Sequence, residues 1–206
     1  MTDSTMVYIV DDDAAVRDAL SMMLEAAGCA VATFPTASDF LDACTPSTQG
    51  CIILDVDMPD MDGPTLQEGL IRRGMQLPVI FLSGKGTIPI TVRTIKAGAM
   101  DFLTKPVDGS VLLDRVQKAL EQCSFLQKQA ENYQSITSRL AALTEREREI
   151  MALAVAGHTS KEIAQRLAIS YRTVEIHRTH VMQKTGASNL LELARIANVF
   201  ESHRTS

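Results

Sequence analysis

The first 120 residues alternate short apolar runs with amphipathic stretches of helical period. Five runs rich in β-branched and other apolar residues predict strands at 7–10, 29–34, 51–55, 78–83 and 99–105. Between and after them, helices are predicted at about 14–27, 38–44, 64–73, 89–97 and from 110 onward. Because the strands are apolar on both sides, both faces of their sheet must be covered. The pattern predicts an α/β fold with a five-stranded parallel sheet and five helices.

The pattern changes between about 110 and 142, where apolar residues recur every three or four positions in a polar, glutamine-rich context. No proline or glycine interrupts the chain from Val111 to Val155. One interpretation is a long helix that continues as a linker with coiled-coil character. The other is an ordinary amphipathic helix followed by a flexible polar linker. The pattern allows both.

The last 65 residues read as four helices separated by capping residues. Thr144 with Glu147 three positions later predicts a capping box, and the next three helices are predicted to begin at Thr159, at Ser170 or Tyr171, and at Ser188. Two short helices joined by the tight turn at 168–170 suggest a helix-turn-helix. The predicted organisation is an α/β domain at 1–121, a helical linker at 122–141 and an all-α domain at 142–206.

Composition places the chain among soluble globular proteins, with 46% hydrophobic and 22% charged residues. No window approaches the apolar length of a membrane-spanning helix, and the first residues lack the features of a signal peptide. The four cysteines have no C-x-x-C spacing, which favours free thiols in a reducing cytoplasm. We therefore expect a cytoplasmic protein without a membrane partner.

Charge is distributed unevenly between the two halves. Residues 140–206 contain nine Lys/Arg and seven Asp/Glu, a net charge of +2, whereas residues 1–139 contain 11 basic and 18 acidic groups, a net charge of −7. An acidic module suits metal or phosphate chemistry, and a mildly basic module suits a polyanionic partner. The overall pI of about 5.4 would by itself argue misleadingly against nucleic acid.

Functional groups follow the predicted strands at their carboxyl ends. Strand one ends at Asp11–Asp13, strand three at Asp55, strand four at Ser83 and strand five at Lys105. In open parallel sheets ligands bind at this edge, so the acids, the hydroxyl and the ammonium are expected together. An all-oxygen acidic site suits Mg²⁺, and a carboxylate beside the ion can act as a nucleophile toward phosphorus.

This set of motifs resembles the receiver domain of two-component response regulators. The matching stretches are VDDD at 10–13, LDVDMPDMDG at 54–63, the Ser-Gly of FLSGKG and the Lys-Pro of DFLTKP. The resemblance implies the flavodoxin/CheY-like fold and a cis peptide at Lys105–Pro106. It also implies an acceptor domain that transfers the phosphoryl group to itself and loses it slowly, not a turnover enzyme.

The resemblance assigns a role to each matching residue. Asp55 becomes the phosphoacceptor, and Lys105 the lysine that binds the phosphoryl group. Asp11, Asp12, Asp55 and the backbone carbonyl of Asp57 become the Mg²⁺ ligands. Ser83 and Phe102 become the switch residues, while the side chains of Asp57 and Lys85 influence phosphoryl lifetime. Asp60 and Asp62 are expected only to form the turn closed by Gly63.

A competing interpretation uses much of the same chemistry. CIILDVD at 51–57 also fits the start of the haloacid-dehalogenase phosphotransferases, in which the first aspartate is phosphorylated and the second is the acid/base. Three features disfavour it: the motif follows another acidic strand, Met58–Pro59 replaces small residues, and no insertion is large enough for a cap domain. Turnover of a phosphate ester would favour it.

Residues 143–193 resemble the LuxR-type helix-turn-helix of the NarL/FixJ regulators, from TEREREI through SKEIA to TVEIH. The small core is expected from Ile163, Ala164, Leu167, Val174, either Ile176 or His177, and Val181. The candidate DNA-contacting side chains are Arg172, Thr173, Glu175, Ile176, Arg178, Thr179 and Lys184. By the resemblance Glu175, Ile176 and Thr179 face base edges, while basic groups bind phosphates. His177 and His180 lie three apart, but without a third ligand nearby in sequence we predict no metal site.

Together the two resemblances predict a transcriptional regulator controlled by phosphorylation. The implied partners are a histidine kinase, promoter DNA and a second copy of the chain on phosphorylation, with RNA polymerase as a further candidate. A constitutive DNA-binding protein with a non-signalling receiver remains the alternative. Phosphorylation by a small donor, lost in Asp55→Asn, would discriminate between the two.

Overall fold

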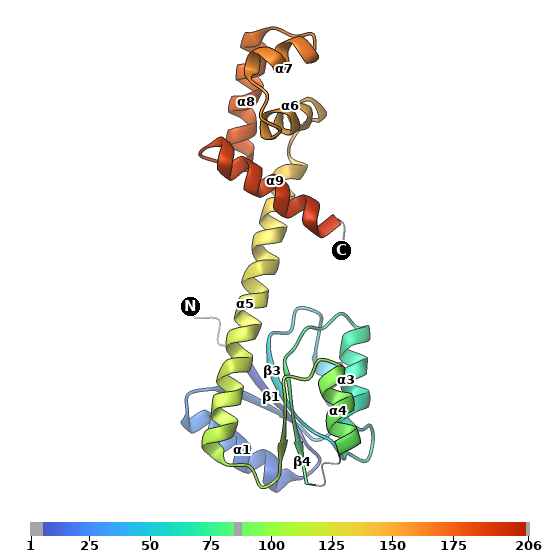
Figure 1. The fold of residues 1–206 in the computed structure, drawn as a ribbon. Coiled ribbons are helices and arrows are strands. Elements are labelled where there is room, and N and C mark those ends of the chain that lie inside the picture. Colours follow the sequence, from blue (N-terminus) through green and yellow to red (C-terminus); the bar gives the residue numbers. More distant parts are fainter. Residues whose placement is uncertain (1–5, 85–87, 205–206) are drawn as a thin grey trace. The chain divides into compact units, whose positions relative to one another are not determined.

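The computed structural model of the chain describes residues 6–84 and 88–204 (Figure 1). These residues belong to two compact units, Met1–Gln127 and Lys128–Ser206. The first unit contains a β-sheet, and the described elements of the second are all helices. Among the described residues, no helix has the length and apolar character needed to span a bilayer.

The first unit is built on a parallel sheet with the strand order β2-β1-β3-β4-β5. Its strands are β1 Met6–Val10, β2 Ala30–Phe34, β3 Gly50–Asp55, β4 Val79–Ser83 and β5 Asp101–Thr104. Its helices are α1 Ala14–Ala26, α2 Ala37–Ala43, α3 Gly63–Arg72, α4 Ile88–Lys96 and the first part of α5 Gly109–Ala141. The predicted α/β fold class is confirmed.

Alternate strand residues serve two separate cores, one on each face of the sheet. Ile52 and Leu54 of β3 pack with α2 and α3, whereas Cys51 and Ile53 pack with α1 and α5. Successive side chains of a strand point to opposite faces, so both sides of β3 are buried. This burial explains why the strand sequences are continuously apolar. The helices on the two faces leave the carboxyl ends of the strands accessible for chemistry.

The helices of the second unit are α6 Glu145–Val155, α7 Ser160–Arg166, α8 Tyr171–Thr185 and α9 Leu190–Arg204. Capping boxes begin α6 at Thr144 and α7 at Thr159, and Ser170 caps α8, as predicted. Gly186 ends α8 in the left-handed conformation with φ of 72°.

The predicted cap at Ser188 is wrong. Asn189 lies directly before α9, and its Oδ1 accepts a 2.9 Å hydrogen bond from the amide of Glu192. Ser188 instead donates its own amide and hydroxyl to the Glu192 carboxylate. Asn and Ser are comparable helix caps, so composition alone could not choose between the two neighbours.

Helix α5 is continuous from Gly109 to Ala141, and the boundary between the two compact units lies within it, after Gln127. Leu112 and Val116 pack in the first unit, whereas Ile136 and Leu140 pack in the second. The secondary structure thus follows the first of the two interpretations of residues 110–142. The domain limits at 121/122 and 141/142 stay predictions.

Candidate functional site: a phosphoacceptor pocket and a recognition helix

Two buried carboxylates share one ammonium at the carboxyl ends of the strands. Asp11 directly follows β1, Asp55 is the last residue of the neighbouring β3, and Lys105 directly follows β5. Lys105 Nζ lies 2.6 Å from Asp11 Oδ2 and 2.6 Å from Asp55 Oδ1. The sheet therefore brings together three groups that are far apart in the sequence, at the edge where the strand pattern placed them.

The second oxygen of each carboxylate is held by a nearby backbone amide. Asp11 Oδ1 accepts a 3.0 Å hydrogen bond from the amide of Asp13, and Asp55 Oδ2 accepts one of 2.8 Å from the amide of Asp57. Both carboxylates are thus fixed in rotation as well as in position. Charge-assisted bonds of this kind hold an acceptor in a single geometry.

Burial and mutual contact shift the ionisation of this pocket. Burial raises the pKa of Asp11, and the neighbouring carboxylate of Asp55 adds to the rise, while hydrogen bonds from Lys105 and the Asp13 amide oppose it. Burial also acts to lower the pKa of Lys105, but its hydrogen bonds to the two carboxylates outweigh burial and raise that pKa overall. Lys105 therefore stays charged and allows two carboxylates to lie close together.

The predicted switch residues lie on the two strands beyond β3. Ser83 is the last residue of β4 and is buried, and its carbonyl accepts a 2.8 Å hydrogen bond from the amide of Lys105. Phe102 of β5 is half-buried and stacks on Phe81 with ring centroids 6.2 Å apart. Lys85, which the resemblance linked to phosphoryl lifetime, lies outside the described residues.

The other acids of the motif have separate surroundings. Asp12 and Asp57 have exposed side chains. Asp62 caps α3 by accepting a 2.8 Å hydrogen bond from the amide of Thr65, and Asp60 accepts from Ser38. Asp62 thus serves the turn that begins α3, whereas Asp60 links this turn to the start of α2. The Lys105–Pro106 peptide is cis, as the resemblance implied.

Two residues near the pocket were missed by the sequence analysis. The Arg17 guanidinium of α1 donates a 2.7 Å hydrogen bond to the backbone carbonyl of Asp11. Gly63 approaches β3 so closely that a Cβ atom there would lie 2.4 Å from the carbonyl oxygen of Asp55. The glycine was visible in the sequence only as a turn residue. No signal in the sequence pointed to Arg17.

The donor chemistry of the pocket fits Mg²⁺. Carboxylate oxygens are the ligands this ion prefers, and it keeps several of its waters, so one or two direct protein ligands suffice. Asp11 and Asp55 offer buried oxygens, and Asp12 offers an exposed carboxylate at the edge of the pocket. Lys105 occupies the space between Asp11 and Asp55, so a cation bound there would share the carboxylates with an ammonium.

Helix α8 presents the second candidate surface. Arg172, Glu175, Ile176 and Thr179 are exposed, and Ile176 retains 48% of its accessible surface. Val174 and Val181 are the buried apolar residues that α8 contributes to the core. The alternative that placed Ile176 in the core is therefore wrong.

Two of the predicted DNA contacts already have partners inside the second unit. Arg178 donates a 2.8 Å hydrogen bond to the hydroxyl of Ser160, and Lys184 donates one of 2.7 Å to Glu147. Both basic groups therefore help to hold α8 against α6 and α7. The remaining exposed side chains of α8 form the surface that can meet a partner without breaking an internal contact.

Comparison with known proteins extends these observations to the whole chain. Residues 7–117 match the family model of the response regulator receiver domain, and residues 141–197 match that of bacterial regulatory proteins of the luxR family. The chain is 42% identical to the transcriptional regulatory protein TdiR of Thauera aromatica, covering 97% of this chain and 88% of that protein. It is 40% identical to FixJ of Azorhizobium caulinodans, covering 96% and 93%.

A solved structure supports the same assignment. The response regulator StyR aligns with a TM-score of 0.88 and 38% identity over 95% of this chain and 98% of that chain. The haloacid-dehalogenase interpretation is thereby replaced. The chain belongs to the response regulators, and it joins a receiver domain to a LuxR-type DNA-binding domain as the FixJ-like transcriptional regulators do.

Proposed function

We propose that Asp55 accepts a phosphoryl group from a histidine kinase and that this modification controls promoter binding by α8. The observation that carries the proposal is the pairing of Asp55 Oδ1 with Lys105 at 2.6 Å, beside a second buried carboxylate, Asp11. A carboxylate fixed beside a cation can approach an anionic phosphoryl group without the repulsion that it would meet alone.

The chemistry is a transfer between two nucleophiles. A carboxylate oxygen of Asp55 attacks the phosphorus of a phosphohistidine, an oxygen–phosphorus bond forms, and the phosphorus–nitrogen bond breaks. The departing imidazole nitrogen takes up a proton. Lys105 offsets the negative charge that the phosphoryl oxygens bring to the pocket. The product is a stoichiometric acyl phosphate that water removes slowly, so the receiver is an acceptor and not a turnover enzyme.

Asp11, Asp12 and Asp55, with the backbone carbonyl of Asp57, would hold Mg²⁺ in this site. The ion, when bound, supplies positive charge for the phosphoryl oxygens during transfer. The support for this ligand set is the all-oxygen donor chemistry at the ends of β1 and β3. Arg17 supports the set indirectly, since its bond to the Asp11 carbonyl fixes the β1–α1 turn that carries two of the ligands.

The phosphorylated state is read through Ser83 and Phe102. The Ser83 hydroxyl donates a hydrogen bond to the new phosphoryl group, and Phe102 moves inward into the space that this leaves. The change remodels the surface of α4, β5 and α5, on which Ile88, Val92 and Ile95 are exposed. A second copy of the chain would cover this apolar surface, so phosphorylation favours a homodimer.

A dimer presents two α8 helices to DNA half-sites one helical turn apart. Glu175, Ile176 and Thr179 would face base edges, and Arg172 and Thr173 would contact the backbone at the start of the helix. Arg178 and Lys184 contact phosphates only by sharing or exchanging their internal partners. RNA polymerase is the further partner proposed at the promoter.

The proposal is tested by comparing wild type, Asp55→Asn and Asp60→Asn, each with and without acetyl phosphate and Mg²⁺. Asp60→Asn is the matched control, because its exposed carboxylate contacts only the Ser38 region in the described structure. Labelling, dimerisation and tighter promoter binding are expected for wild type and Asp60→Asn and are lost in Asp55→Asn. Equal promoter affinity in all conditions would instead support constitutive DNA binding.

A further inference from the structure

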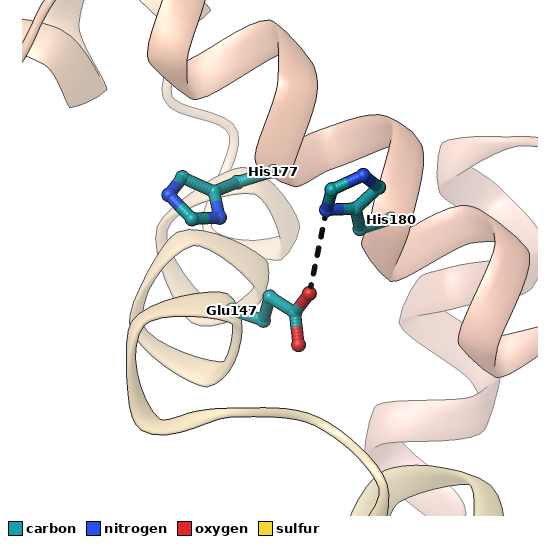
Figure 2. Close-up of side chains that lie close together, drawn as sticks. All are labelled: Glu147, His177 and His180. Carbon is teal, nitrogen blue, oxygen red and sulfur yellow. Dashed lines mark ion pairs between the residues drawn. The ribbon is translucent and has the colours of Figure 1, made fainter.

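Three metal-ligating side chains converge between α6 and α8 of the second unit, away from the phosphoacceptor pocket. Glu147 lies in the first turn of α6, and His177 and His180 lie three residues apart on α8. One ligand atom from each lies within 4.8 Å of the others. Figure 2 shows the Glu147 carboxylate of α6 below the two imidazole rings of α8, with a dashed line joining it to His180. Folding thus supplies the third ligand whose absence nearby in sequence led us to predict no metal site.

The two carboxylate oxygens of Glu147 have different contacts. Glu147 Oε2 accepts hydrogen bonds of 2.7 Å from Lys184 and 2.8 Å from the Thr144 amide. Glu147 Oε1 lies 3.8 Å from His180 Nδ1, which is too far for a hydrogen bond (Figure 2). This oxygen faces the histidines while the other holds the helix cap, so the carboxylate can bind a cation without losing its structural contacts.

His177 provides the second observation that points to a ligand. Its Nδ1 atom is buried and has no hydrogen-bond partner among the described residues. Buried polar atoms in folded proteins are nearly always satisfied, so a buried imidazole nitrogen beside a carboxylate needs an explanation. A neutral imidazole offers a lone pair to a metal ion, which satisfies the nitrogen without a protein donor.

We propose that Glu147, His177 and His180 bind a divalent transition-metal ion, with Zn²⁺ as the expected occupant. Two imidazoles and one carboxylate are a known ligand set for this ion, with a water in the fourth position. His180 is half-exposed, so solvent can reach that fourth position.

The geometry requires a modest adjustment. Tetrahedral ligands about 2.0–2.1 Å from the ion lie about 3.4 Å from each other. The three ligand atoms, which lie within 4.8 Å of one another, must therefore come closer together. The exposed His180 side chain is the one free to rotate. Lys184 on the same carboxylate opposes a cation, so the site is weaker than the closed zinc sites of zinc fingers.

A bound ion would join the recognition helix to the helix that supports it. Glu147 belongs to α6, and both histidines belong to α8. Because the ion binds the folded arrangement and not the unfolded chain, it stabilises the second unit by mass action. Binding also holds the His180 side chain of α8 against α6.

The test uses full-length protein freed of metal with a chelator, then titrated with Zn²⁺ alone and separately with Co²⁺. Wild type is expected to bind one Zn²⁺ at this site and to melt at a higher temperature with it. His180→Gln should weaken binding by at least about tenfold, as loss of a supporting group already does in other metal sites. His158→Gln is the matched control, since His158 lies in the same unit outside the cluster, and it should bind as wild type does.

The Co²⁺ spectrum separates this site from the four free cysteines of the first unit. Nitrogen and oxygen ligands give visible bands without the strong near-ultraviolet absorption of a cobalt–thiolate bond. Thiolate absorption alone, equal Zn²⁺ affinity in His180→Gln, or no binding by wild type would each overturn the proposal. Since His180 is half-exposed, its substitution leaves the fold intact, and circular dichroism checks this.

Discussion

Lys105 Nζ lies 2.6 Å from Asp55 Oδ1, so the proposed nucleophile is already paired with a cation before any phosphoryl group arrives. The same ammonium lies 2.6 Å from Asp11. It therefore balances two buried carboxylates that would otherwise repel each other. This pairing also means that the ammonium and a bound Mg²⁺ would compete for the same oxygens.

The Lys105→Met variant is expected to bind Mg²⁺ more tightly and to be phosphorylated more slowly. Removing the ammonium ends its repulsion of the ion and should tighten Mg²⁺ binding by about five- to tenfold. The phosphoryl oxygens meanwhile lose a counter-charge, so the labelling rate at saturating Mg²⁺ should fall at least about tenfold. Calorimetry gives the first quantity and radiolabelling by acetyl phosphate the second. Lys96→Met, which removes an exposed lysine, should change neither.

We expect the histidine kinase to approach the receiver at an apolar concavity beside Lys105. It is lined by α1 residues, by Leu82 of β4 and by the chain that follows β5. Ala19 of α1 lines it and is exposed, so Ala19→Arg should obstruct a protein donor without disturbing Asp55. Transfer from a phosphorylated kinase should fall at least about tenfold, because a buried unpaired charge is costly at an interface. Labelling by acetyl phosphate should stay at the wild-type rate, and an equal loss with both donors would contradict the docking assignment.

Gly63 is expected to resist even the smallest side chain. A Cβ atom there would lie 2.4 Å from the Asp55 carbonyl and 2.8 Å from the Phe81 ring, and neither group is free to move in the core. Gly63→Ala should therefore destabilise the receiver by about 1–3 kcal/mol, as overpacking of cores does. Thermal melting checks this.

The control variant lies on the same helix, and its expected effect on stability has the opposite sign. Gly69→Ala places its Cβ 3.9 Å from the flexible end of the Arg72 side chain, an ordinary van der Waals contact. Since alanine favours a helix over glycine, this variant should gain about 0.5–1 kcal/mol. A Gly63→Ala protein as stable as wild type would show that α3 can move away from β3.

Sequence patterns predicted the parts of the fold that depend on local chemistry. The apolar runs identified all five strands, and the cap signals at Thr144, Thr159 and Ser170 located three helix starts, because side-chain period and capping are properties of neighbouring residues. The ends of the strands then indicated Asp11, Asp55 and Lys105, since parallel topology fixes which ends meet.

Long-range contacts between side chains escaped the same reasoning. The Lys184–Glu147 ion pair depends on how α6 and α8 pack, which no local pattern encodes. The position of Glu147 beside two histidines is of the same kind. Glu147, the residue of this cluster that the sequence missed, therefore comes from helix packing and not from a strand end.

The Glu147–Lys184 pair predicts an acid-sensitive second unit. The hydrogen bond from Lys184, aided by the Thr144 amide, lowers the pKa of Glu147 from 4.5 to about 2. Because the folded-state pKa is depressed, the stabilisation is fully present above pH 4.5 and is lost as the pH falls toward 2. Glu147→Gln lacks this contribution, so it should be less stable than wild type at neutral pH, and the difference should narrow below pH 4.5.

Urea unfolding followed by far-ultraviolet circular dichroism, in EDTA to remove divalent ions, measures that difference at each pH. Glu149→Gln serves as the control, because Glu149 lies on the same helix but forms a partly exposed ion pair with Arg146. Exposed pairs contribute little, so this variant should follow wild type within about 0.5 kcal/mol at every pH. A stability difference for Glu147→Gln that stays constant from pH 7 to pH 3 would show that the side chain acts through its shape and not through its charge.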